Sequence, residues 1–284
     1  MRSLIVALLA LALLPAGAQA KQKPHYYVSL GDSLAVGMQA SPDGDTVRTN
    51  QGYADVLYKQ LRKSDKRLRH VKLGCGGEST STMLNGGICV YGGLERPEFD
   101  SQQDAAEDFL RHHRKQIKLV TLDIGANNFV RCASGGAING ECLNNGLARL
   151  DRELPRIARG IRKAAGGKAP IAGMTLYDPF WSLYLKGDQA SRDTATLSSG
   201  LAANVRDRLI KGYGAGDMKI ADVFGAFKTA DQTMVDYQGQ QVPRAVERIC
   251  ALTYMCASGL RNGNIHANPD GYKVIAQAFR DALK

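Results

Sequence analysis

The sequence predicts an α/β protein built around a parallel β-sheet. Short apolar segments rich in β-branched residues alternate with longer segments of helical periodicity along most of the chain. Strands that are separated by helices form parallel sheets covered on both faces, with right-handed crossovers. The composition is that of a globular protein, because 44% of the 284 residues are apolar and 23% are charged. Intrinsic disorder, collagen and coiled coil are therefore excluded.

Five short apolar segments predict the strands of this sheet. Residues 26–30 (YYVSL) and 70–73 (HVKL) are each followed by a glycine. Residues 119–124 (LVTLDI) have the most strongly apolar character, which is typical of a strand buried on both faces. The expected strands are residues 26–30, 70–73, 119–124, 170–176 and 218–223.

Segments with helical spacing of apolar residues lie between these strands. Residues 53–61 carry apolar side chains at positions 53, 54, 56, 57 and 61, and residues 147–164 predict a long amphipathic helix. Pro269 is a favourable first-turn residue and predicts the start of the closing helix. The expected helices are residues 53–61, 105–113, 147–164, 197–210 and 269–283.

The first twenty residues predict a secretory signal peptide. Arg2 is followed by an apolar run from Leu4 to Leu14 and by small residues that end at Ala20. The apolar run is too short to span a bilayer permanently. Cleavage after Ala20 leaves residues 21–284, which we expect to form a single domain with loop insertions in a secreted protein, extracellular or periplasmic.

The basic balance of the chain does not predict a nucleic-acid partner. The formal net charge is +10, from 37 Lys and Arg against 27 Asp and Glu, and loss of Arg2 with the signal peptide makes it +9. The basic residues are dispersed, with one modest cluster at residues 59–69. A solvated helix face explains this cluster.

Six cysteines form three close couples in Gly-rich and polar sequence that is typical of loops. An exported chain meets an oxidising compartment, in which thiols pair. Six cysteines allow 15 connectivities, of which pairing between neighbours is the simplest. The sequence has no CxxC and no Cys/His finger spacing, so we expect no metal. The expected disulfides are Cys75–Cys89, Cys132–Cys142 and Cys250–Cys256.

Four polar segments follow predicted strands or precede the closing helix. Sites in parallel sheets lie beyond the carboxyl ends of the strands, so these segments are expected to meet. Ser33 can serve as a nucleophile at a strand-to-helix turn, while Gly77 and Asn127 can bring N–H donors to the same point. His266 is the histidine best placed to accept the serine proton. Each residue alone has a simpler explanation as a turn or cap, but their conjunction favours an active site.

These segments resemble the four sequence blocks of the SGNH hydrolases, also called the GDSL esterase and lipase family. The GDSL motif matches residues 31–34, the second block residues 76–80, the GxN motif residues 125–127, and the final histidine His266. The resemblance implies a flavodoxin-like three-layer α/β/α sandwich with a central parallel sheet of about five strands. It also implies hydrolysis of small-molecule or lipid esters by a monomer without cofactors. Ser33 would be the nucleophile and His266 the general base, and the oxyanion hole would comprise the N–H groups of Ser33 and Gly77 with the Asn127 side chain.

The chain departs from the family pattern at two positions. Gly263 stands where the family commonly has the aspartate of a DxxH pattern, and Asn128 stands where it commonly has the aspartate of GxND. The second change is expected to affect loop packing. For the first, we expect the backbone carbonyl of Gly263 or Asn264 to orient His266. Three aspartates could replace it, although each has a simpler structural explanation: Asp123, Asp178 and Asp270.

Several alternatives to a secreted esterase or lipase remain open. A carbohydrate O-acetylesterase would use the same machinery, and Gly263 also allows a non-catalytic secreted binding protein on this scaffold. A cysteine hydrolase using Cys75 is opposed by export and by pairing with Cys89. Four large side chains after the fourth strand could line an acyl pocket or only pack an insertion: Phe180, Trp181, Leu183 and Tyr184. Transient contact with a lipid or cell-wall surface also fits the basic, exported chain.

Overall fold

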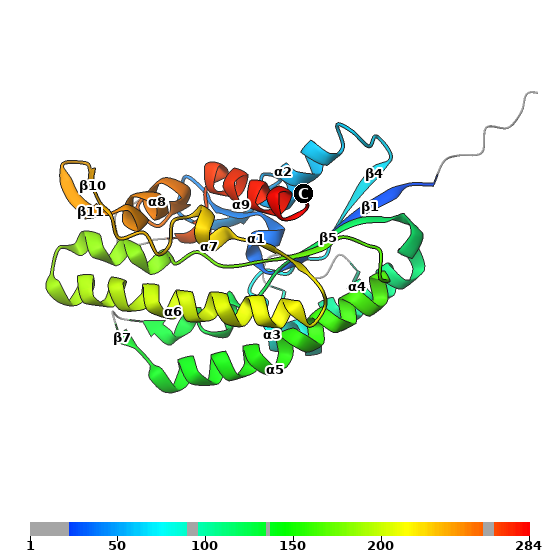
Figure 1. Cartoon of the computed structure of the whole chain (residues 1–284), viewed down its shortest axis with the longest axis horizontal. Helices are drawn as coiled ribbons and strands as arrows, with labels where there is room; N and C mark the ends of the chain where they lie inside the picture. Colours follow the sequence, from blue (N-terminus) through cyan, green and yellow to red (C-terminus); the bar gives the residue numbers. More distant parts are fainter. Residues whose placement is uncertain (1–22, 90–95, 135–136, 258–263) are drawn as a thin grey trace, which may run out of the picture.

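The protein is built around a central sheet of five parallel strands (Figure 1). This computed structural model describes residues 23–89, 96–134, 137–257 and 264–284. The strand order is β4-β1-β5-β8-β9, which is the flavodoxin-like order 2-1-3-4-5. The predicted α/β fold class is confirmed. The signal peptide expected at residues 1–20 lies outside the described residues. The strands are β1 His25–Gly31, β4 Leu68–Lys72, β5 Ile117–Asp123, β8 Ile171–Met174 and β9 Lys219–Ala221.

Helices cover both faces of this sheet and complete three layers (Figure 1). One face carries α2 (Tyr53–Leu61) and α9 (Pro269–Ala282), which pack against each other. The opposite face carries α4 (Gln102–His113), α5 (Gly140–Ala165) and α6 (Gln189–Gly214), with α5 in contact with both neighbours. The architecture is therefore the α/β/α sandwich expected from the resemblance.

Short elements occupy the connections between these layers. Most lie near the carboxyl ends of the strands or in the insertions that follow β5, β8 and β9. The short helices are α1 Ser33–Val36, α3 Thr80–Asn85, α7 Val223–Ala226, α8 Arg244–Leu252, η1 Arg114–Gln116, η2 Ala126–Asn128, η3 Val130–Cys132 and η4 Pro179–Lys186. The short strands are β2 Met38–Ala40, β3 Thr46–Arg48, β6 Ala133–Ser134, β7 Ala137–Ile138, β10 Met234–Tyr237, β11 Gln240–Pro243, β12 Thr253–Tyr254 and β13 Asn264–Ala267.

Two helices begin about two turns earlier than their apolar periodicity predicts, and α4 begins three residues earlier. The helix expected at 147–164 begins at Gly140, and the helix expected at 197–210 begins at Gln189. Apart from Cys142 and Leu143 in α5, the added residues are polar or small, and each helix start is stabilised by a capping side chain. Asn139 accepts a hydrogen bond from the Cys142 N–H, and Asp188 accepts one from the Ser191 N–H.

Aromatic side chains fill the space between the sheet and its helices. On one face, the buried rings of Tyr53 in α2 and Phe279 in α9 stack with their centroids 4.8 Å apart. On the other face, buried Tyr213 of α6 lies flat over Gly173 of β8. A Cβ atom at position 173 would lie 2.5 Å from the Tyr213 ring, so the close approach of α6 to the sheet requires glycine there.

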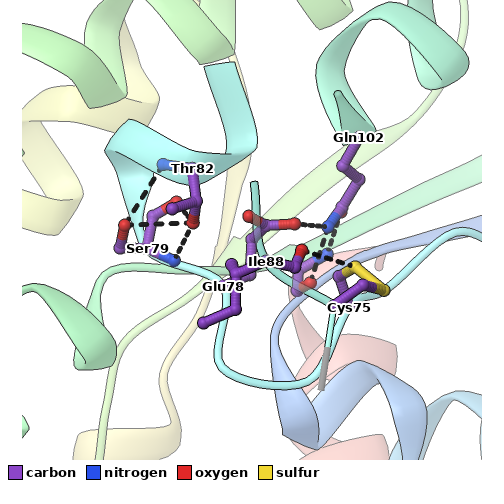
Figure 2. The surroundings of a disulfide bond; sticks show 8 residues. Cys75, Glu78, Ser79, Thr82, Ile88 and Gln102 are labelled. Atoms are coloured by element: carbon purple, nitrogen blue, oxygen red, sulfur yellow. Dashed lines mark hydrogen bonds between the residues drawn. A yellow bond between two sulfur atoms is a disulfide. The ribbon is translucent and has the colours of Figure 1, made fainter. Parts of the chain in front are cut away.

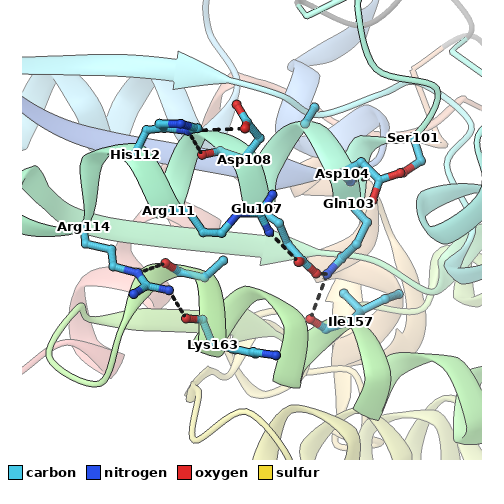
Figure 3. A network of polar contacts seen from close by, with 12 residues as sticks. Ser101, Gln103, Asp104, Glu107, Asp108, Arg111, His112, Arg114, Ile157 and Lys163 are labelled. Atoms are coloured by element: carbon cyan, nitrogen blue, oxygen red, sulfur yellow. Dashed lines mark hydrogen bonds and ion pairs between the residues drawn. The ribbon is translucent and has the colours of Figure 1, made fainter.

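Polar contacts join α4 to α5 along the same face (Figure 3). Arg114 follows α4 and donates to the carbonyl oxygens of Ala164 (2.8 Å) and Lys163 (3.0 Å) in the last turn of α5. These carbonyls lack partners within their own helix, and a cation is favourable at a helix C-terminus. Arg114 therefore fixes the end of α5 against α4.

Within the described ranges, three disulfides join the neighbouring cysteines that the sequence analysis paired. They are Cys75–Cys89, Cys132–Cys142 and Cys250–Cys256, with sequence separations of 14, 10 and 6. Figure 2 shows the surroundings of Cys75, which follows β4. Because Cys75 is bonded to Cys89, it has no thiol for the cysteine-hydrolase alternative.

No helix in the described ranges has both the length and the apolar character needed to cross a membrane.

Removing the longest-range disulfide is expected to cost the most stability. A Cys75→Ser/Cys89→Ser variant should lose about 3 kcal/mol of unfolding free energy, because the open chain gains the entropy that a 14-residue closure removes. This loss corresponds to a fall in Tm of about 6 to 12 °C for a chain of this size. The matched control is Cys250→Ser/Cys256→Ser, whose shorter separation predicts a loss of about 2 kcal/mol. Calorimetry that finds the reverse ranking would contradict this account.

Candidate active site

The candidate nucleophile lies at the carboxyl end of the inner strand β1. Gly31 ends β1 opposite Asp123 of β5, and Ser33 begins helix α1 two residues later. Gly31 has φ of 130°, and a Cβ atom there would lie 1.9 Å from the Asp123 carbonyl oxygen. Only glycine fits this sharp turn, which leaves the Ser33 side chain partly exposed at the edge of the sheet.

A buried carboxyl group holds this turn from below. Oδ2 of Asp123 accepts hydrogen bonds from the N–H groups of Asp32 (3.3 Å) and Ala35 (3.2 Å). Oδ1 accepts one from the Tyr53 hydroxyl at 2.5 Å. Asp32 in turn caps α1, since its Oδ1 accepts from the Leu34 N–H at 3.0 Å. The backbone on both sides of Ser33 is thus fixed by the side chains of Asp123 in β5 and of Asp32, which directly follows β1.

The two carboxyl groups beneath Ser33 are both fully buried. Burial raises the pKa of Asp123 well above its usual range, and the nearby Asp32 raises it further. Burial also raises the pKa of Asp32. Burial, and for Asp123 also the proximity of Asp32, thus disfavours the charged form of these carboxyl groups.

The candidate base reaches Ser33 from the other end of the chain. His266 lies in β13, directly before α9, whose first turn is capped by Asn268. Its Nε2 lies 2.8 Å from the Ser33 Oγ, and its Nδ1 lies 2.6 Å from the Oδ1 of Asn264. The Asn264 oxygen also accepts from the His266 backbone N–H at 2.9 Å, which identifies it as the amide oxygen. The proton of the neutral imidazole is therefore on Nδ1, and Nε2 is free to accept from Ser33.

The expectation that a backbone carbonyl orients His266 is wrong for Asn264. Its side-chain Oδ1 takes this role, because the asparagine side chain folds back onto the backbone two residues later, as asparagine commonly does in turns. Its Nδ2 donates to the Thr46 Oγ1 at 2.9 Å, which fixes the amide from the other side. Gly263 lies outside the described residues.

None of the three aspartates considered as replacements has a hydrogen bond to His266 among the described residues. Asp123 binds the nucleophile turn and Tyr53, as described above. Asp178 accepts from the Phe180 N–H and the Ser198 hydroxyl, and exposed Asp270 pairs with Lys273. Each has the structural role that its sequence position suggested.

Burial determines the protonation state of His266. It lowers the pKa of His266 from 6.5 to about 4, because the buried imidazolium loses its hydration. The partner on Nδ1 is a neutral amide, so it supplies no negative charge to offset this effect. His266 is consequently neutral at neutral pH, as a general base must be.

Of the expected oxyanion donors, Asn127 shares a cavity with Ser33 and His266. Its Nδ2 donates to the Glu78 carbonyl at 2.9 Å and lies 3.4 Å from the Asp32 Oδ2. Gly77 does not line this cavity, but it lies in the turn after β4 with φ of 81°, next to the Glu78 carbonyl that Asn127 holds. This hydrogen bond therefore connects Asn127 to the loop that carries Gly77.

Asn128, the other departure from the family pattern, packs the loops of the site. Its Oδ1 accepts from the Thr80 N–H at 2.9 Å, and its Nδ2 donates to the Thr80 hydroxyl at 2.7 Å. The side chain is buried and connects η2 to the start of α3. This contact supports the expectation that the change affects loop packing.

Gln102 is a site residue that sequence reasoning missed. Its Oε1 accepts from the Gly31 N–H at 2.6 Å, while its Nε2 donates to the Gly31 carbonyl and to the Glu78 Oε2, each at 2.9 Å (Figure 2). It therefore connects the nucleophile turn to the loop that carries Gly77. Burial raises the pKa of its partner Glu78 to about 7. Nothing in the sequence around Gln102 distinguishes it from an ordinary residue in the first turn of a helix.

A largely apolar cavity opens beside Ser33 and His266. It extends between η2 and η3 on one side and η4 and α6 on the other. Of the four large side chains considered for an acyl pocket, Phe180 lines this cavity, whereas buried Trp181 donates to the Thr229 carbonyl. No group of three or more His, Cys, Asp or Glu side chains suited to a metal ion occurs in the described ranges.

Comparisons with known proteins identify the family and the fold. A family model for GDSL-like lipases and acylhydrolases matches residues 29–274, so the chain belongs to this family of carboxylic ester hydrolases. Among solved structures, an extracellular lipase from Streptomyces rimosus is 17% identical, with a TM-score of 0.55 over 91% of this chain and 99% of that one. An acetylxylan esterase from Geobacillus stearothermophilus is 15% identical, with a TM-score of 0.51 over 92% of this chain and 94% of that one. These structures share the fold. A search of curated protein sequences found no match.

Replacing the amide that orients His266 by a carboxylate should change the titration of this histidine. In Asn264→Asp, a negative charge at Nδ1 favours the imidazolium, so the pKa of His266 should rise from about 4 to about 5 or higher. NMR titration of the imidazole signals measures this change. His70, whose pKa burial lowers to about 3, serves as an internal control that should not move. A His266 pKa near 6.5 in the unsubstituted protein would contradict the assignment to burial.

Proposed function

We propose that this protein is a secreted serine esterase or lipase that hydrolyses carboxylic esters through an acyl-enzyme on Ser33. The observation that carries the proposal is the hydrogen-bonded series Ser33 Oγ, His266 Nε2, His266 Nδ1 and Asn264 Oδ1, with distances of 2.8 Å and 2.6 Å. A nucleophile, a base and a group that orients the base are the parts that acyl transfer needs.

The first step is the attack of Ser33 on the ester carbonyl. The proton of the hydroxyl passes to Nε2 of His266, while the Asn264 oxygen keeps the other ring nitrogen protonated. An amide oxygen stabilises the resulting imidazolium through its dipole, whereas a carboxylate would do so through a full charge. The neutral Asn264 side chain therefore keeps Ser33 and His266 in the geometry of a catalytic triad, but it stabilises the imidazolium less than a carboxylate would.

The developing oxyanion needs donors on the side of Ser33 away from His266. The N–H groups of Ser33 and Gly77 and the Nδ2 of Asn127 fill this role in the proposal, and the contact of Asn127 with the Glu78 carbonyl supports their common location. Loss of one such donor costs about 3 to 4 kcal/mol of transition-state stabilisation in enzymes of this type. Collapse of the intermediate expels the alcohol, which takes the proton from His266, and water then releases the acid by the same steps.

Secretion is part of the proposal. The signal-like residues 1–20 and the three disulfides both favour an oxidising destination, either extracellular or periplasmic. The proposed mature form is a monomer of residues 21–284 that works as one domain and makes transient contact with lipid or cell-wall surfaces.

Substitution of Ser33 tests the proposed nucleophile. Ser33→Ala should lower kcat/KM for p-nitrophenyl butyrate by at least about 10⁴-fold, because no acyl-enzyme can form. The fold should persist, since the Ser33 hydroxyl has a hydrogen bond only to His266 within the described residues. Ser64→Ala, which removes an exposed hydroxyl on a turn, is the matched control and should retain full activity. Hydrolysis by Ser33→Ala at the rate of the control, with both proteins folded by circular dichroism, would refute the assignment.

A further inference from the structure

The cavity beside Ser33 has two apolar walls that face each other. One wall is a face of α6, formed by Leu201, Ala202 and Val205 together with Ser198. These positions span two helical turns, or about 10 Å along the helix axis, which is roughly the length of an extended eight-carbon acyl chain. An acetyl group would contact only the end of this wall nearest Ser33.

The opposite wall comes from the insertion between β5 and α5. Ile138 and Leu143 both line the cavity, as does Cys132 of the Cys132–Cys142 disulfide. This covalent bond closes the segment that carries Ile138 and fixes it at the first turn of α5. The second wall is thus held in place independently of any bound ligand.

Apart from Ser33, His266 and Asn127 of the candidate catalytic machinery, the polar side chains of the described lining are already engaged in hydrogen bonds within the protein. Asp178 accepts from the Ser198 hydroxyl at 2.7 Å and from the Phe180 N–H at 2.9 Å. The Tyr177 hydroxyl donates to the Ile265 carbonyl at 2.7 Å. A carbohydrate needs several free donors and acceptors, because its hydroxyls lose their bonds to water on binding. An aliphatic chain needs none.

We propose that this cavity binds the acyl chain and that the substrates are esters of unbranched fatty acids of about eight carbons or more. This inference rests on the proposed function, because the cavity begins at Ser33 and His266. Each CH₂ group transferred from water to the apolar walls in the transition state should raise kcat/KM about four-fold. Ala202 lies in the middle of the α6 face, so a large side chain at this position would obstruct the path of the acyl chain.

The test compares p-nitrophenyl acetate, butyrate and octanoate at concentrations below their aggregation. For the unsubstituted protein, kcat/KM should be at least ten-fold higher for octanoate than for acetate. Ala202→Trp fills the cavity from the α6 wall and should lower this octanoate-to-acetate ratio at least ten-fold. Leu143→Trp fills the cavity from the opposite wall and should also lower the octanoate-to-acetate ratio at least ten-fold. If Ala202→Trp fails to fold, Leu143→Trp is the variant that tests the acyl-chain site. Ala190→Trp, at an exposed position in α6, is the matched control and should leave the ratio unchanged.

Two results would overturn the inference. The first is an octanoate-to-acetate ratio of one or less in the unsubstituted protein, and the second is an unchanged ratio in folded Ala202→Trp and Leu143→Trp. Ser33→Ala, measured on acetate, separates these failures from failure of the proposed function. If Ser33→Ala is inactive and the ratio is one or less, Ser33 remains the nucleophile and only the acyl-chain site is refuted.

Discussion

The hydrogen bond between Ser33 and His266 joins residues 233 positions apart, and the surrounding structure serves to keep these two side chains at 2.8 Å. Ser33 is placed by β1, the second strand of the sheet in spatial order, and His266 by β13, the short strand directly before α9. Tyr53 in α2 stacks on Phe279 in α9, so the helix that follows His266 packs against the first long helix after Ser33. Because the strands are parallel, the end of β1 and the loops after β4 and β5 meet at one edge of the sheet.

Neutral groups and buried carboxyl groups dominate the electrostatics of this site. His266 faces an amide oxygen, and burial lowers its pKa, so it remains an unprotonated base at neutral and mildly acidic pH. Beneath Ser33, Asp123 accepts three hydrogen bonds that position the nucleophile turn, while its pKa is raised by burial and by Asp32. Burial raises the pKa of Asp123, whereas the hydrogen bonds from the Tyr53 hydroxyl and the Asp32 N–H lower it. Asp123 thus supports the nucleophile turn from below the serine, while burial disfavours the charged form of its carboxyl group.

Periodicity and short motifs predicted most of the fold and the chemically reactive pair. The five strands, the layers of helices and the candidate residues Ser33, Asn127 and His266 all follow from patterns within a few residues of each position. The orienting role of the Asn264 side chain could not be predicted from such patterns, because it depends on the rotamer by which this side chain folds back onto His266. The role of Gln102 was not predicted either, because it depends on hydrogen bonds to Gly31 and Glu78, which are distant in sequence. The early starts of α5 and α6 were likewise not predicted, because most of the added residues are polar or small.

The central claim is that His266 activates Ser33, and covalent labelling tests it most directly. Treatment with diethyl p-nitrophenyl phosphate, followed by peptide mass spectrometry, should place one diethylphosphoryl group on the peptide that contains Ser33. The same treatment of folded His266→Ala should leave that peptide unlabelled, because the hydroxyl is no longer activated. Label on another residue, or equal labelling of Ser33 with and without His266, would contradict the account.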